Sequence, residues 1–198
     1  MLSSHSFFFD NLRNDGHTLT FKLHSDKGLE IKYHDDYFYD NILLMAPGAV
    51  LKDTLSQAEL VDFVDKGHNL MVFADDSSGM TYRRLANQFG IDFEQTGFLL
   101  RDHENERSKL YSQDGEIVFS KHVFEGLFDI REDGKHAYDV FSELKAEVAF
   151  RGIGHVVDPK NDFVFPILRA ASTSFSTRPD YSEISRVSGG HLNLVSGY

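Results

Sequence analysis

Two short polar segments that follow apolar runs carry the side chains best placed for chemistry. The run from Ile42 to Ala46 ends at Pro47-Gly48, and the run from Leu70 to Ala74 ends at Asp75-Asp76-Ser77-Ser78-Gly79. If both runs are strands of one parallel sheet, these turns lie at its carboxyl edge, where ligands gather in open α/β sheets. We therefore expect a ligand or partner surface at Pro47, Gly48, Asp75, Asp76, Ser77 and Ser78.

The serines of the second segment have two interpretations. A serine nucleophile between a strand and a helix is expected within the pattern Gly-x-Ser-x-Gly, which is absent around Ser77 and Ser78. Capping of the following helix is therefore the favoured role. The alternative is a hydrolase or amidotransferase-like enzyme that uses Asp75, Asp76, Ser77 or His103.

Other polar clusters also have a structural interpretation beside a functional one. Asp102-His103-Glu104 offers carboxylates and an imidazole for acid/base or metal chemistry, but adjacent residues point in different directions, and no histidine has a partner at metal-binding spacing. Gly152-Ile-Gly154 is a fragment of a dinucleotide fingerprint whose third glycine is replaced by Val157, so a turn is favoured. The sequence predicts no catalytic residue, no cofactor site and no metal site.

A cluster of aromatic residues surrounds Asp35-Asp36. Tyr33, Tyr37, Phe38 and Tyr39 lie within a few positions of these carboxylates. Aromatic faces with carboxylate acceptors suit a carbohydrate, but the same residues also suit the packing of a loop at a sheet edge. Packing is the favoured interpretation, and a carbohydrate-binding module stays as an alternative function.

Composition limits the classes of partner. The chain has 198 residues, 41% of them hydrophobic, so we expect one folded domain. Its formal net charge of −11 argues against nucleic acid, whose phosphates require clustered Lys and Arg. The chain has no cysteine, which excludes disulfides and thiolate metal sites within it. No apolar run reaches the length of a membrane helix, and the first residues do not resemble a signal peptide.

The order of the predicted elements indicates an α/β fold. A helix capped by Ser4 or Ser6 ends at Gly16, and Thr18 to Leu23 alternates like a strand. Ser56 and Glu59 form a capping box for a helix that ends at Gly67. The continuously apolar run at 70–74 indicates a strand covered on both faces, and a helix over 82–89 follows it. We expect a mostly parallel sheet with helices on both faces and, since the chain opens on a helix, a first strand missing upstream.

The second half of the chain gives weaker signals. The stretch from about 101 to 145 is rich in both signs of charge and is interpreted as an irregular excursion with a strand at 117–119 and a helix over 138–144. Further short strands are expected at 148–150, 155–157, 163–168 and 191–195.

Several segments together resemble the family of the forty-eight-kilodalton (Wbp1-like) subunit of eukaryotic oligosaccharyltransferase. They follow the family's order across almost the whole chain, and Asp102-His103 falls where the family carries Asp-His. The matching segments are His5-Ser-Phe-Phe8, Leu19-Thr-Phe-Lys22, Ile31-Lys-Tyr33, Tyr39-Asp-Asn41, Phe150-Arg-Gly-Ile-Gly154, Val157-Asp-Pro159 and Ser172-Thr-Ser-Phe-Ser176.

The resemblance implies a flavodoxin-like or glutamine-amidotransferase-like domain spanning residues 1–198, on the lumenal side of the endoplasmic reticulum membrane, as a fragment of a larger subunit. It implies a non-catalytic accessory role in N-linked glycosylation, supporting assembly and substrate positioning. The expected partners are other subunits of the complex, together with the lipid-linked oligosaccharide or the nascent chain. Membrane attachment is expected only through a C-terminal helix that these residues lack, and the charged stretch at 101–145 departs most from the family.

Overall fold

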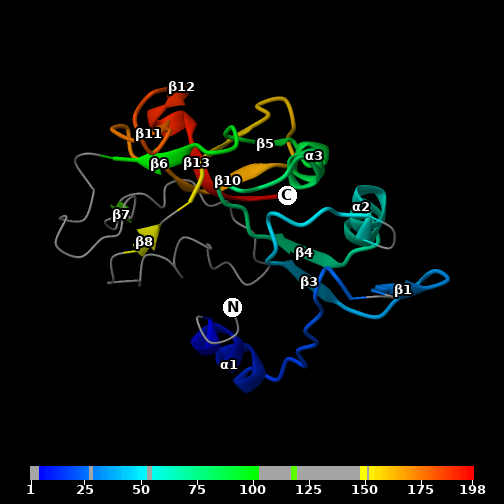
Figure 1. The fold of residues 1–198 in the computed structure, drawn as a ribbon. Coiled ribbons are helices and arrows are strands. Elements are labelled where there is room, and N and C mark those ends of the chain that lie inside the picture. Colours follow the sequence, from blue (N-terminus) through cyan, green and yellow to red (C-terminus); the bar gives the residue numbers. More distant parts are fainter. Residues whose placement is uncertain (1–4, 27–28, 53–54, 103–116, 120–147, 151) are drawn as a thin grey trace, which may run out of the picture.

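The structure is a computed structural model that describes residues 5–26, 29–52, 55–102, 117–119, 148–150 and 152–198 (Figure 1). Its helices are α1 (Ser6–Asn14), α2 (Gln57–Asp65), α3 (Met80–Gln88) and the 3-10 turn η3 (Gly189–His191). Its strands are β1 (Lys32–Tyr33), β2 (Asp36–Tyr37), β3 (Asn41–Leu44), β4 (Asn69–Val72), β5 (Ile91–Phe93), β6 (Leu99–Arg101), β7 (Ile117–Phe119), β8 (Val148–Phe150), β9 (His155–Val157), β10 (Phe165–Arg169), β11 (Phe175–Thr177), β12 (Ile184–Ser188) and β13 (Asn193–Gly197).

The first half contains a parallel unit, as the sequence predicts. β3 and β4 pair in parallel with Ile42 opposite Leu70, and α2 connects them. The Ser56 hydroxyl accepts a hydrogen bond from the Glu59 amide at the start of α2, and Gly67 after its end has a φ of +88°. Only glycine adopts that φ without strain. The Ser56 cap and the glycine stop therefore fix the length of the crossover helix.

One face of this parallel pair carries the core of the unit. Leu44 of β3 packs in one buried cluster with Leu60 of α2 and with Tyr82 and Leu85 of α3. Leu60, Tyr82 and Leu85 are 0% exposed. Because both helices contribute to the same cluster, they cover the same face of the pair.

The other face of the pair corrects the prediction of helices on both faces. Met71 is 53% exposed and Phe73 is 37% exposed, and no helix of the described residues packs over them. A run of apolar residues is compatible with a strand buried on one face or on two, so periodicity does not separate the cases. A strand is confirmed here but runs over Asn69–Val72, two residues short of the predicted end, and among the described residues helices cover only one of its faces.

The mostly parallel sheet is also corrected. Apart from β3–β4, every strand pair of the described residues is antiparallel. A four-stranded sheet has the order β10-β13-β9-β5, and a three-stranded sheet has the order β12-β11-β6. Together these two sheets form the antiparallel lobe, whose apolar core includes Leu100, Leu168, Leu192 and Leu194. The described residues thus combine helices with small, mostly antiparallel sheets, and the predicted flavodoxin-like or glutamine-amidotransferase-like parallel sheet is not confirmed.

The beginning of the chain departs from two predictions. α1 begins at Ser6 with His5 as its N-cap and no side-chain cap, so Ser6 does not cap it, and Ser4 lies outside the described residues. Residues 18–23 form no strand. Phe9 is 5% exposed and packs edge-on against Phe21, whereas Phe7 is 80% exposed. This helix lies apart from the antiparallel lobe (Figure 1).

The expected strands at 117–119 and 148–150 are confirmed and pair with each other. The expected helix over 138–144 lies outside the described residues.

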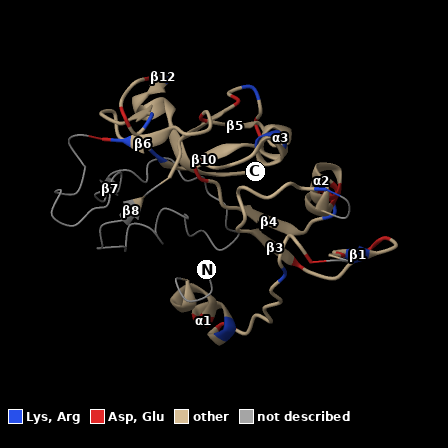
Figure 2. Cartoon of the chain, in the orientation of Figure 1, with Lys and Arg blue, Asp and Glu red and all other residues tan. Residues whose placement is uncertain are grey.

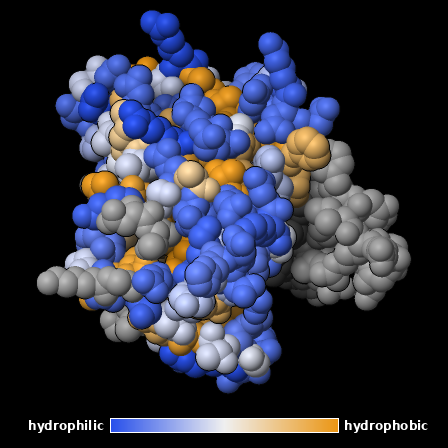
Figure 3. Space-filling view, turned by 90° about the vertical axis from the view of Figure 1, so that its right-hand side faces the viewer, coloured by the Kyte–Doolittle hydropathy of each residue, from blue (hydrophilic) through white to orange (hydrophobic). Residues whose placement is uncertain are grey.

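No described helix is both long and apolar enough to cross a membrane. The face in Figure 3 is largely hydrophilic with scattered apolar residues.

We expect Leu60→Ala to lower the free energy of unfolding by roughly 2–5 kcal/mol, because it opens a cavity in the core of the parallel unit. Met71→Ala is the matched control: it also shortens an apolar side chain, but on the exposed face of β4. Urea titration followed by far-UV circular dichroism measures both. Equal losses for the two variants would contradict the one-sided core.

Candidate functional site

The structure brings together the two turns that the sequence identifies. The turn at Pro47-Gly48 follows β3, and the turn over 75–79 follows β4, so both lie at the carboxyl edge of the parallel pair. The Gly79 amide donates a hydrogen bond of 3.1 Å to the Pro47 carbonyl. The prediction that the two turns lie side by side is therefore confirmed.

The polar side chains of the second turn bind the turn itself. The Ser77 amide and hydroxyl both donate to Asp75 Oδ1, at 2.8 and 2.6 Å. The Ser78 hydroxyl, which is fully buried, accepts a 2.9 Å bond from the Asp75 amide. These contacts hold the chain in shape as it leaves β4. The N-cap of α3 is Gly79, so neither serine caps that helix in the way the sequence predicts.

Arg83 connects this turn to the antiparallel lobe. Its Nε donates to the Ser78 carbonyl at 3.1 Å, and its Nη1 donates to the carbonyls of Phe93, at 3.0 Å, and Glu94. Burial lowers the pKa of Arg83, while Asp92 and Glu94 oppose that effect. One guanidinium thus joins the end of β4 to the end of β5.

Asp102 is a buried carboxylate of the antiparallel lobe. It is 0% exposed and accepts hydrogen bonds from the hydroxyls of Thr173, at 2.9 Å, and Ser174, at 2.8 Å. These contacts bring together two segments that carry the family resemblance, although 71 residues separate Asp102 from Thr173. His103 and Glu104 lie outside the described residues.

The segment Gly152-Ile-Gly154 connects the two antiparallel sheets. The carbonyl of Gly152 accepts from the Leu100 amide at 3.1 Å, and that of Gly154 accepts from the Glu94 amide at 3.0 Å. A Cβ at Gly154 would lie 3.0 Å from Leu192, which leaves little room for a side chain. The glycines thus serve close backbone packing, and the segment shows no helix after it.

The aromatic cluster around Asp35-Asp36 is divided between two roles. Tyr37 packs edge-on against Phe63, and its hydroxyl donates to Asp62 at 2.7 Å. Burial and the neighbouring carboxylates raise the pKa of Tyr37. Tyr33 and Phe38 are instead 66% and 53% exposed. The predicted packing role is therefore confirmed for Tyr37, whereas Tyr33 and Phe38 are largely exposed to solvent.

A network of charges fixes the β1–β2 hairpin on α2. Lys32 pairs with Glu59 and Asp62, and Asp62 also pairs with Lys66 at 3.3 Å. Charges of both signs on α2 are visible in Figure 2. The Glu59 side chain is used here, so only the serine half of the predicted capping box is formed.

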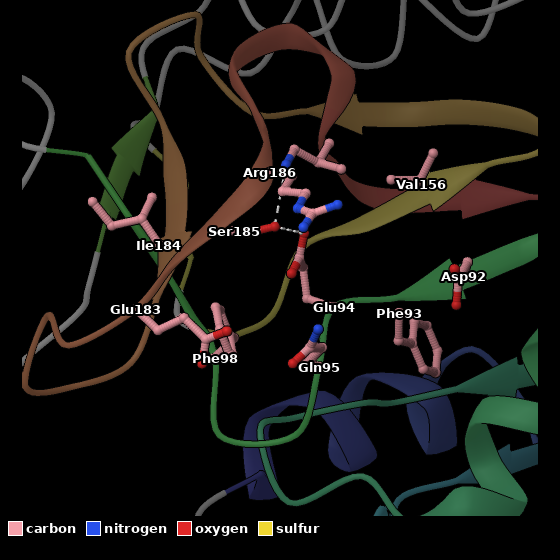
Figure 4. A pocket seen from close by; sticks show the side chains of 11 residues that line it. Asp92, Phe93, Glu94, Gln95, Phe98, Val156, Glu183, Ile184, Ser185 and Arg186 are labelled. Atoms are coloured by element: carbon pink, nitrogen blue, oxygen red, sulfur yellow. Dashed lines mark hydrogen bonds between the residues drawn. The ribbon is translucent and has the colours of Figure 1, made fainter.

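A cavity of about 410 Å³ lies in the antiparallel lobe and is lined by residues other than those of the two turns (Figure 4). Glu94 lines it and is only 9% exposed. The Ser185 hydroxyl donates to Glu94 Oε1 at 2.8 Å. Burial is the largest effect on Glu94 and raises the pKa of its carboxyl group. Sequence reasoning missed this residue, because its partner lies 91 positions away.

His155 on β9 is a second buried titratable group. It is 6% exposed, its Nε2 lies 2.7 Å from the Ser196 hydroxyl, and burial lowers its pKa to about 4. Among the described residues, no group of three or more histidine, aspartate or glutamate side chains is arranged to hold a metal ion.

The chain was compared with known proteins. A family model described as "OST48, N-terminal domain" matches residues 2–198. Proteins named as the 48 kDa subunit of dolichyl-diphosphooligosaccharide–protein glycosyltransferase are 30% identical in Danio rerio and 29% identical in Arabidopsis thaliana and Caenorhabditis elegans. Each alignment covers 98% of this chain and 43% of the relative, so the chain spans less than half the length of these relatives.

We expect Arg83→Met to lower the free energy of unfolding by roughly 2–4 kcal/mol, because three backbone carbonyls lose a charged donor. Arg84→Met removes the same charge from the next, exposed position of α3 and should change stability by less than about 0.5 kcal/mol. Chemical denaturation measures the difference between the two variants. Similar losses would show that Arg83 does not connect the two parts of the fold.

His155→Gln should make the free energy of unfolding less sensitive to acid. With a native pKa of about 4 and an ordinary value of 6.5, the unfolded chain binds more protons between these limits, so stability falls as the pH drops through this window. The full effect is up to roughly 3 kcal/mol. Denaturation at pH 7 and pH 4.5 should show a smaller acid loss in His155→Gln than in the unsubstituted chain. His191→Gln, at an exposed position, should retain the full loss.

Proposed function

Because the chain belongs to the family of the OST48 N-terminal domain, we propose that it is part of an accessory subunit of an oligosaccharyltransferase complex. The observation that carries this proposal is the family match over residues 2–198, together with relatives named as the 48 kDa subunit of such a glycosyltransferase. The role of the domain would be to support the assembly of the complex that carries out N-linked glycosylation and the positioning of its substrates.

We propose further that this domain does not carry out the transfer itself. The use of its polar side chains supports the proposal. Asp75 holds Ser77 within the turn, and the Ser78 hydroxyl binds the Asp75 amide. Asp102 binds the hydroxyls of Thr173 and Ser174. Each of these groups stabilises the backbone or a neighbouring strand.

The setting of the domain follows from the same proposal. Residues 1–198 would form one domain on the lumenal side of the endoplasmic reticulum membrane. Its partners would be other subunits of the complex, with the lipid-linked oligosaccharide or the nascent chain as substrates to be positioned. The surface formed by Pro47, Gly48, Asp75, Asp76 and Ser77 remains the predicted contact region, and the exposed Ser77 lies on it. Ser78, which the sequence predicts to belong to this surface, is fully buried and supports the turn from within.

Carbohydrate binding is a second candidate function, favoured by one observation. Tyr33 and Phe38 are exposed on the β1–β2 hairpin and its continuation, and the Asp35 side chain beside them is 98% exposed. Exposed rings next to carboxylate acceptors are suited to stacking and hydrogen bonding with a sugar. Glycan-array binding that is lost in Tyr33→Ala and Phe38→Ala would support this role, and no binding on the array would exclude it.

We expect cells depleted of the full-length protein to underglycosylate a secreted reporter, and the unsubstituted gene to restore glycosylation. A variant with Asp75→Asn, Asp76→Asn, Ser77→Ala and His103→Ala should restore it to the extent that the variant still assembles with the other subunits, because Asp75, Asp76 and Ser77 also lie in the predicted contact region. The side-chain amide oxygen introduced at position 75 can still accept the hydrogen bond from the backbone amide of residue 77, so the turn is retained without an acid, base or nucleophile.

Native affinity purification of the same proteins provides the second measurement. The unsubstituted protein should recover the other subunits of the complex, and a loss of recovery by the variant would report on the contact region and not on catalysis. Failure of the variant to restore glycosylation while it still recovers those subunits would contradict the non-catalytic role. Failure of the unsubstituted protein to recover them would overturn the proposed membership of the complex.

A further inference from the structure

The cavity contains a buried acid, Glu94, whose carboxylate is in no ion pair among the described residues. Glu94 is 9% exposed, and its carboxylate accepts a hydrogen bond from Ser185. Arg83 donates to the backbone carbonyl of Glu94 and not to its carboxylate. Arg83 lies close enough to favour the charged form of Glu94, but burial is the larger effect and raises the pKa of its carboxyl group. A cation bound directly to the carboxylate would offset the cost of that burial.

The walls of the cavity suit an aliphatic chain that ends in a cation. Phe93 and Val156 contribute apolar surface, and Asp92 and Glu183 place further carboxylates on opposite sides of Glu94 (Figure 4). Lysine and arginine bury their aliphatic stems against such surfaces while the charged end reaches an acceptor.

The charge around the cavity also favours a cation. The basic lining residue is Arg186, which is exposed and forms no hydrogen bond with Glu94 among the described contacts. Glu183 pairs with Arg178 at 3.1 Å, so its charge is partly compensated, whereas Asp92 is exposed and in no ion pair of the described residues. The buried end of the cavity is thus acidic.

The surrounding strands favour a polypeptide over a free amine. β5 and β12 both contribute residues to the cavity. Each is the outermost strand of its sheet in the part of the chain that the structure describes. An extended segment can lie along such edges through its main chain while one side chain enters the cavity between them.

We propose that this cavity binds a lysine or arginine side chain of a polypeptide segment, with the cation on Glu94 and the aliphatic stem against Phe93 and Val156. This site goes beyond the proposed accessory role, because it names a ligand class and a position that membership of a complex does not require. It also differs from the predicted contact region at the turns after β3 and β4.

The test measures binding of two fluorescein-labelled peptides to the full-length protein by anisotropy. One is Gly-Lys-Gly and the other is Gly-norleucine-Gly, both with blocked ends. They share the aliphatic stem and differ in the ammonium group. We expect the lysine peptide to bind roughly ten- to a hundredfold more tightly, as a charged hydrogen bond at a buried site predicts. Equal binding of the two peptides would overturn the proposal.

Substitution of Glu94 provides the matched comparison. Glu94→Gln keeps the shape and can still accept from Ser185, but it should lower the affinity for the lysine peptide to that for the norleucine peptide. Asp65→Asn removes one exposed charge from α2 and should leave binding unchanged. Equal weakening by both variants would show only a general attraction to an acidic protein and would also overturn the proposal.

The pH dependence of peptide binding distinguishes Glu94 from the other charged and titratable groups around the cavity. These groups are Asp92, Glu183, Arg83, Arg186 and, on β9, His155. Protons compete with the cation for the carboxylate, so binding to the unsubstituted protein should weaken as the pH falls from 7.5 to 5. Glu94→Gln should bind with little pH dependence. A dependence that persists in that variant, or a neutral trisaccharide that displaces the lysine peptide, would assign the site to another group or ligand.

Discussion

The contacts of Arg83 join two parts of the fold that are built on different principles. Its guanidinium binds a carbonyl of the turn after β4 and two carbonyls at the end of β5. In the parallel unit, one amphipathic helix, α2, connects two neighbouring strands. In the antiparallel lobe, most of the strands that pair come from segments far apart in the sequence. A planar, permanently charged group with several donors suits such a junction better than an ammonium would. Its Nη2 is buried with no hydrogen-bond partner in the part of the chain that the structure describes, a cost that the other contacts must offset.

The antiparallel lobe depends on buried polar groups because its strands are short. β5, β6, β9 and β11 each have three residues, so each contributes few apolar side chains. Asp102, His155 and Glu94 fill interior positions and are held by hydroxyl groups of Thr173, Ser174, Ser196 and Ser185. These hydroxyls come from segments far along the chain, so the hydrogen bonds also fix which strands lie together. Glu94 and His155 have opposite pH responses, because burial favours the neutral form of each.

The sequence predicts the local features well and the distant ones poorly. The Ser56 cap, the Gly67 stop and the helical spacing of Tyr82 and Leu85 are each determined within one or two turns of chain, and all are confirmed. The strand Phe175–Thr177 has two polar residues facing the interior and no alternation to mark it. Its pairing with β6 makes it a strand. The same limitation hid the Glu94 cavity, since neither Glu94 nor Ser185 is distinctive until the fold brings them together.

The position of the candidate sites bears on what a domain of this family can do. In a doubly wound sheet, the turns after the parallel strands would be the natural place for chemistry. Here those turns use their own hydroxyl and carboxylate groups to fix the backbone, which leaves them as a surface. The buried acid Glu94, which forms no ion pair among the described residues, lies instead in the antiparallel lobe, beside two edge strands. Asp92 and Glu183 flank it, and Phe93 and Val156 supply apolar walls. Acidic groups beside apolar walls suit the cationic side chain that we propose as the ligand.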